Sequence, residues 1–161
     1  MGDEKQYHTE VLAAMRLNVG GETLWKEYKS GFLKEEWPSA CEEIFSSVKL
    51  GNYRIFPWYA LEERYDLMMD ALKVNFYSDH LKTYEKKLKA LYPERCLTLL
   101  VADTIKMAEQ SSKRADYRRV AKNLRWIQRY PGGDEKAEEL ANDFRTKYRQ
   151  RHAMMEEIEE F

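Results

Sequence analysis

Residues 93–133 decide the fold, and they read PERCLTLLVADTIKMAEQSSKRADYRRVAKNLRWIQRYPGG. This segment holds two helix-length stretches between three breaks, which are Pro93, the serine pair 111–112 and the Pro-Gly-Gly run 131–133. Apolar side chains recur at helical spacing inside each stretch, so each stretch predicts a helix with one buried face. Short connections favour antiparallel packing of the two helices.

The same pattern extends in both directions along the chain. Further helices are predicted over residues 3–18, 22–35, 38–51, 56–75, 78–91, 134–148 and 151–160. Ser78, Ser111 or Ser112, and Asp134 are the predicted helix caps, because short polar side chains satisfy free backbone N–H groups. The only β-like stretch, residues 49–58, is too isolated to form a sheet.

These stretches predict an all-α fold. Residues 57–93 and 93–133 form two units of similar length, close to that of known helical repeats. Antiparallel helix pairs are therefore expected to stack as a short, repeat-like α-solenoid array, with a helical bundle as the alternative. Residues 1–161 are expected to form a single helical domain, which could also be a piece of a longer protein.

The composition excludes several classes of protein. The formal net charge is −1, so no overall positive field attracts nucleic acid or membranes. No apolar run is long enough to span a bilayer, and the charged first residues do not resemble a secretion signal. Two cysteines are too few for a disulfide framework, which favours free thiols and a cytoplasmic location.

The C-terminal half carries a recognisable series of residues. The series runs through Leu91-Tyr92-Pro93-Glu94, residues 114–124, the glycine pair 132–133, and residues 147–158. It resembles the helical C-terminal region of bacterial proteins that carry a SWIM-type zinc finger. The zinc finger itself is missing, because Cys41 and Cys96 cannot supply its Cys-x-Cys and Cys-x-His pairs. The resemblance therefore implies a helical segment similar to tetratricopeptide arrays, with a role in protein contacts and no zinc.

One predicted helix, which extends from Lys113 to Tyr130, carries a basic face. Its cations are Arg114, Arg118, Lys122, Arg125 and Arg129. Like charges at this spacing repel one another and need compensation. One interpretation is a site for phosphate, nucleic acid or an acidic peptide. The favoured alternative is that these cations pair with acidic residues, either Glu138, Glu139 and Asp143 or the glutamates after Met155.

Trp126 lies beside these cations on the same helix. An exposed tryptophan there could stack on a base or clamp a partner. The favoured alternative is packing, because a helix in a stacked array often buries two faces.

No local signature of catalysis or metal binding occurs, and no cofactor is expected. His8, His80 and His152 each stand alone. Cys96 is expected to be a small buried residue, and the glutamate pairs, including Glu62-Glu63, are expected to lie on solvated faces or at helix starts. Met68-Met69 is expected to fill the core. Met154-Met155 either fills the core or lines a groove for a partner helix.

We therefore expect a non-catalytic scaffold or adaptor that binds a protein partner. The alternative is an anion-binding or nucleic-acid-binding module that uses the basic face and Trp126. An enzyme whose site is assembled from distant residues is a third hypothesis, which a cleft with titratable groups of shifted pKa would favour. The sequence does not reveal the partner or the oligomeric state.

Overall fold

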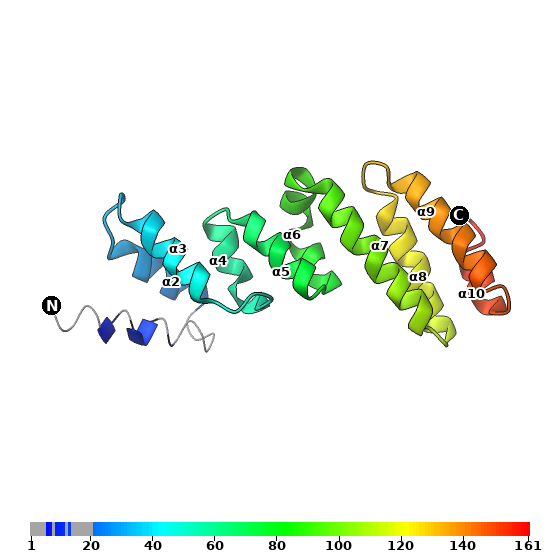
Figure 1. The fold of residues 1–161 in the computed structure, drawn as a ribbon, viewed down its shortest axis with the longest axis horizontal. Helices are drawn as coiled ribbons and strands as arrows, with labels where there is room; N and C mark the ends of the chain where they lie inside the picture. The colour runs from blue at the N-terminus through cyan, green and yellow to red at the C-terminus, as the bar shows by residue number, and fades with distance from the viewer. Residues whose placement is uncertain (1–5, 8, 12, 14–20) are drawn as a thin grey trace. The chain divides into compact units, whose positions relative to one another are not determined.

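A computed structural model describes residues 6, 7, 9–11, 13 and 21–161, and all regular elements among them are helices (Figure 1). The predicted all-α fold is confirmed. The chain divides into two compact units, Met1–Asn75 and Phe76–Phe161. The single domain expected over residues 1–161 stays a prediction.

The first unit consists of short helices. They are α2 (Gly21–Ser30), α3 (Trp37–Ser47), the 3₁₀ helix η1 (Tyr53–Ile55), α4 (Phe56–Leu61) and α5 (Tyr65–Val74). Residues 6, 7, 9–11 and 13 are helical, and the rest of the helix predicted over 3–18 lies outside the described residues. The β-like stretch contains η1 and the start of α4.

The helix predicted over residues 56–75 is interrupted, so that prediction is wrong. Glu63 adopts a left-handed conformation with φ of 55°. Its N–H donates to the Ala60 carbonyl at 3.3 Å, and the Arg64 N–H donates to the Tyr59 carbonyl at 2.8 Å. These two bonds form a Schellman motif, which ends α4. Glycine usually occupies this left-handed position, so a glutamate there gives no sequence signal.

Aromatic rings fill the core of the first unit. Trp25 of α2 lies between Phe45 of α3 and Trp58 of α4, with ring centroids 5.3 and 5.2 Å away and nearly parallel planes. Trp37 meets Trp25 edge-on at 5.3 Å. Each such pair contributes about 0.5–1.5 kcal/mol beyond its buried area. Stacking between the indole and phenyl rings therefore ties three helices together.

Glu62 lies against this cluster. Its carboxylate accepts hydrogen bonds from Trp25 Nε1 at 2.8 Å, Trp37 Nε1 at 2.9 Å and Lys29 Nζ at 2.9 Å. The side chain is only 11% exposed, and Glu62 is the C-cap residue of α4. The expectation that Glu62 lies on a solvated face or at a helix start is therefore wrong. The three donors satisfy the buried charge and lower the pKa of Glu62, against the opposing effect of burial.

The second unit contains the longer helices. They are α6 (Ser78–Leu91), α7 (Pro93–Gln110), α8 (Arg114–Ile127) and α9 (Gly133–Lys147), and the short helix α10 (His152–Glu157) follows them. Figure 1 shows α7, α8 and α9 side by side, with the chain reversing direction at each connection. α8 contacts α7, α9 and α10 and is the central helix of this unit. The breaks predicted at Pro93, the serine pair and the glycine pair are confirmed.

The predicted caps are displaced from the observed ones. Tyr77, Lys113 and Gly132 occupy the N-cap positions of α6, α8 and α9 without a side-chain hydrogen bond. The Ser111 hydroxyl instead donates to the Met107 carbonyl at 2.6 Å. Gly132 has φ of 71°, a left-handed conformation that suits a residue without a side chain.

Candidate functional site

The C-terminal segment partly neutralises the predicted basic face. Arg114 pairs with Glu156 and Glu157, Arg118 with Glu157, and Arg125 with Glu160. The bond from Arg114 Nε to Glu157 measures 2.9 Å, and it is the main reason why the pKa of Glu157 is lowered. Pairing with the glutamates after Met155 is thus confirmed for three of the five cations.

Lys122 and Arg129 complete the basic face and differ from the other three. Both side chains are exposed. Among the described residues, neither has a carboxylate within ion-pair distance. The basic face therefore has two parts. Arg114, Arg118 and Arg125 form ion pairs with the C-terminal segment, whereas Lys122 and Arg129 have no ion pair among the described residues.

Trp126 packs inside the second unit rather than projecting into solvent. Only 6% of its surface is exposed, so the packing interpretation is confirmed. Its Nε1 donates to Glu85 Oε1 at 2.6 Å, and the Tyr130 hydroxyl donates to the same oxygen at 3.0 Å. Lys82 Nζ lies 5.1 Å from the centroid of the indole ring. These contacts join α6 to α8.

Three hollows lie along α6, α7 and α8, and they share lining residues. The first, of about 340 Å³, is lined by Asp103, Lys106, Met107, Gln110, Ser111, Asp116 and Arg119. The second, of about 290 Å³, is lined by Tyr77, Ser78, Asp79, Lys82, Met107, Arg119, Lys122 and Asn123. The third, of about 310 Å³, is lined by Lys82, Glu85, Lys122, Asn123, Arg125, Trp126 and Arg129. We call this continuous surface the α6–α8 groove.

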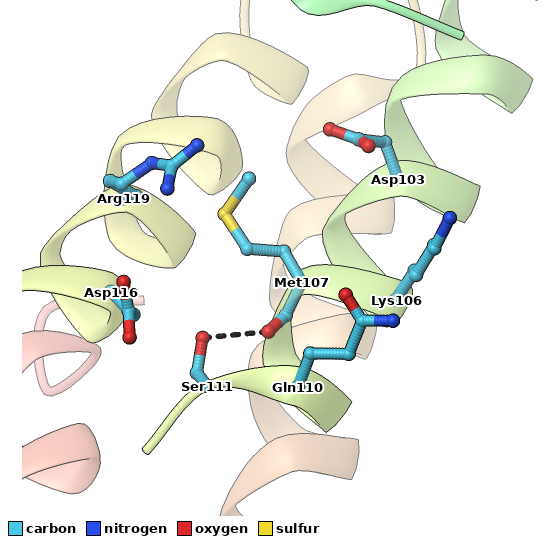
Figure 2. A pocket seen from close by; sticks show the side chains of 7 residues that line it. All are labelled: Asp103, Lys106, Met107, Gln110, Ser111, Asp116 and Arg119. Carbon is cyan, nitrogen blue, oxygen red and sulfur yellow. Dashed lines mark hydrogen bonds between the residues drawn. The ribbon is translucent and has the colours of Figure 1, made fainter. Parts of the chain in front are cut away.

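Figure 2 shows the hollow near the end of α7. The Met107 side chain extends from α7 toward Arg119 of α8, and Ser111 closes the hollow below it. Asp103 accepts a long hydrogen bond of 3.4 Å from the Asn123 carboxamide. Burial raises the pKa of Asp103, although Asn123 and nearby cations act in the opposite direction.

Sequence reasoning found only part of this groove. It identified Lys122, Arg125, Arg129 and Trp126, which line the third hollow. It missed Arg119, which lies on the same helix, and all the contributions of α6 and α7. Arg119 is one residue away from the predicted stripe, and a search for a single narrow face excludes it.

The two cysteines and three of the four paired methionines lie in the protein interior. Cys41 and Cys96 are both free and buried, and burial raises their pKa to about 12 and about 11. Both therefore remain thiols at neutral pH, as the buried interpretation of Cys96 requires. Met68, Met69 and Met154 are fully buried, so the first methionine pair fills the core as predicted.

Among the described residues, no three His, Cys, Asp or Glu side chains are grouped in a way that could hold a metal ion. His8 lies outside the described residues. None of the described helices combines the length and the apolar character that crossing a membrane requires.

The sequence matches no family model, no curated protein and no solved structure. The resemblance to the helical region of SWIM-type zinc-finger proteins therefore stays a prediction. The described residues define an all-helical protein with an open groove on its second unit, lined mostly by charged and polar residues.

Proposed function

We propose that this chain is a non-catalytic helical scaffold that binds a segment of a protein partner in the α6–α8 groove. The main support is the continuity of the groove, because neighbouring hollows share Met107, Arg119, Lys82, Lys122 and Asn123. A continuous groove suits an extended chain better than a compact ligand.

The lining of the groove also favours a protein partner over a small molecule. Small-molecule pockets enclose most of their ligand and are mainly apolar. Here most of the residues that line each hollow are charged or polar, and the apolar or aromatic ones are Tyr77, Met107 and Trp126. Charged side chains around a few apolar contacts are typical of the rim of a protein interface.

A random-peptide display selection on the purified full chain tests this function. We expect enriched peptides that bind the wild type and lose binding to Met107→Trp, which fills space shared by two hollows. The matched control is Leu91→Trp, because Leu91 is already 53% exposed and does not line the groove. Circular dichroism would confirm that both variants fold.

The outcome against the proposal is equally specific. A selection that enriches no peptide, or only peptides that bind wild type and Met107→Trp equally, would show that the groove is not a protein-binding site.

A second candidate function is anion or nucleic-acid binding through the basic face. Lys122 and Arg129 favour it, because both are exposed and unpaired among the described residues. Against it, Arg114, Arg118 and Arg125 are paired with glutamates. If this candidate is correct, oligonucleotide affinity falls steeply with salt and is lost in Arg118→Glu/Arg125→Glu. No binding at low salt would eliminate it.

A further inference from the structure

We propose that the α6–α8 groove takes an extended acidic segment of the partner protein. This inference rests on the proposed function and adds the chemistry of what is bound. The lining carries more cations than anions. The cations are Lys82, Lys106, Lys122, Arg119, Arg125 and Arg129, and the anions are Asp79, Asp103, Asp116 and Glu85.

Several of these charges already have partners. Lys82 forms an ion pair with Asp79 at 3.3 Å. Glu85 accepts hydrogen bonds from the Trp126 indole N–H and the Tyr130 hydroxyl. The Asp103 carboxylate accepts from Asn123.

The remaining cations form a line along the groove. Lys106 and Arg119 lie in the first hollow, Arg119 and Lys122 in the second, and Lys122 and Arg129 in the third. All four are exposed, and among the described residues none has a carboxylate within ion-pair distance. Successive carboxylates of an extended chain could meet successive cations.

The chain itself supplies an example of this recognition. Glu160, from the C-terminal segment, pairs with Arg125 in the lining of the third hollow. A carboxylate on a flexible side chain therefore fits a cation of this groove. Lys106, Arg119, Lys122 and Arg129 offer further cations to carboxylates from another chain, although Lys106 and Arg119 also act electrostatically on Asp103.

Asn123 favours a peptide over a nucleic-acid strand. Asn123 lines two hollows, and the residue is 8% exposed. Its carboxamide carries both donor and acceptor atoms, and one of its donors already reaches Asp103. A peptide main chain also has both N–H donors and carbonyl acceptors. A DNA phosphate backbone has acceptor oxygens but no N–H donors, so it can use only the donor side of this carboxamide.

Fluorescence anisotropy with labelled peptides tests the inference on the full chain. The probes are an alternating Glu-Ser peptide, its Gln-Ser counterpart and its Lys-Ser counterpart. We expect the glutamate peptide to bind about tenfold or more tightly than the glutamine peptide, because each carboxylate gains a cationic partner. Added salt should weaken this preference.

Charge-reversal variants locate the binding. Arg119→Glu/Lys122→Glu should abolish binding of the glutamate peptide. The matched control, Lys87→Glu/Arg149→Glu, changes the formal charge by the same amount at two exposed positions outside the groove lining. The control should retain most of the affinity.

Three results would overturn the inference. The first is that the glutamate peptide does not bind. The second is that the glutamine peptide binds as tightly as the glutamate peptide. The third is that Lys87→Glu/Arg149→Glu loses as much affinity as Arg119→Glu/Lys122→Glu. Tighter binding of a thymidine oligonucleotide at the same residues would replace it with nucleic-acid recognition. If the display selection enriches neutral or basic peptides that bind the wild type but not Met107→Trp, the inference of an acidic partner is wrong and the proposed function is still supported.

Discussion

Glu62 is the residue that most changes the interpretation of the first unit. From the sequence it was one of several glutamates expected on a solvated face or at a helix start. In the structure it accepts from Trp25, Trp37 and Lys29. A single-sequence pattern cannot identify these partners, because they lie 37, 25 and 33 positions away along the chain.

We expect Glu62→Gln to destabilise the protein by about 1–3 kcal/mol. The amide has nearly the same shape, but it loses the charge that strengthens the bonds from Lys29 and both indoles. Urea unfolding followed by tryptophan fluorescence measures the change.

Glu63→Gln is the matched control, because it makes the same chemical change at the neighbouring, exposed position. Its unfolding midpoint should stay close to that of the wild type. Equal effects at the two positions would contradict the role assigned to the Glu62 carboxylate.

Among the helices, those bounded by strong sequence breaks were predicted best. α6, α7 and α9 begin within a residue of the positions that Ser78, Pro93 and Asp134 indicated. The break between α4 and α5 was missed because the apolar period continues through Tyr65, and no glycine or proline interrupts it. The break depends on backbone hydrogen bonds at the end of α4, which leave no compositional trace.

The turn between α8 and α9 depends on Gly133. A Cβ atom there would lie 1.9 Å from the Ile127 carbonyl oxygen, well inside van der Waals contact. We expect Gly133→Ala to destabilise the protein by about 1–3 kcal/mol, because the backbone must shift to relieve the overlap. Thermal unfolding followed by far-ultraviolet circular dichroism measures this loss.

Gly31→Ala serves as the comparison for that variant. Its Cβ atom would lie 3.5 Å from the Tyr28 carbonyl oxygen, which is ordinary contact. A change within about 0.5 kcal/mol is expected. If the two alanine variants unfold alike, close approach of the backbone at Gly133 is not what shapes the turn.

At the scale of the whole molecule, the two units differ in their response to acid. Hydrogen bonds lower the pKa of Glu62, and the Arg64 guanidinium lowers the pKa of Asp66. In the unfolded chain the pKa is about 4.3 for Glu and about 3.9 for Asp. A carboxylate with a lower pKa in the folded state stabilises the fold at pH values above its unfolded-state pKa. This stabilisation is lost as the pH falls through the folded-state pKa. In the second unit, the raised pKa of Asp103 has the opposite sign and offsets the lowered pKa of Glu157.

We therefore expect the first unit to unfold first as the pH falls below about 4. Three of the four tryptophans, residues 25, 37 and 58, belong to that unit. The fluorescence of Trp126→Phe then reports on the first unit alone, while far-ultraviolet circular dichroism reports on both.

In an acid titration the fluorescence change should precede the loss of helix. Adding Glu62→Gln should make the fluorescence transition less dependent on pH. Coincident transitions, or no effect of that second substitution, would contradict this account.

The candidate site shows where sequence reasoning stops at this scale. The cations of α8 were visible, because they follow one another at helical spacing. Asp79, Lys82 and Lys106 lie on other helices, and their approach to α8 depends on how those helices pack. The fold class follows from local periodicity, whereas the groove arises from contacts between segments distant along the chain.

The stack of Trp25 on Trp58 has an optical consequence. Their centroids are 5.2 Å apart and their planes differ by 13°, so the electronic transitions of the two indoles are close enough to couple. Such coupling produces a paired positive and negative band in the circular dichroism spectrum whenever the transition dipoles are skewed. We expect this band from the first unit as a spectroscopic signature of its native packing that needs no attached dye.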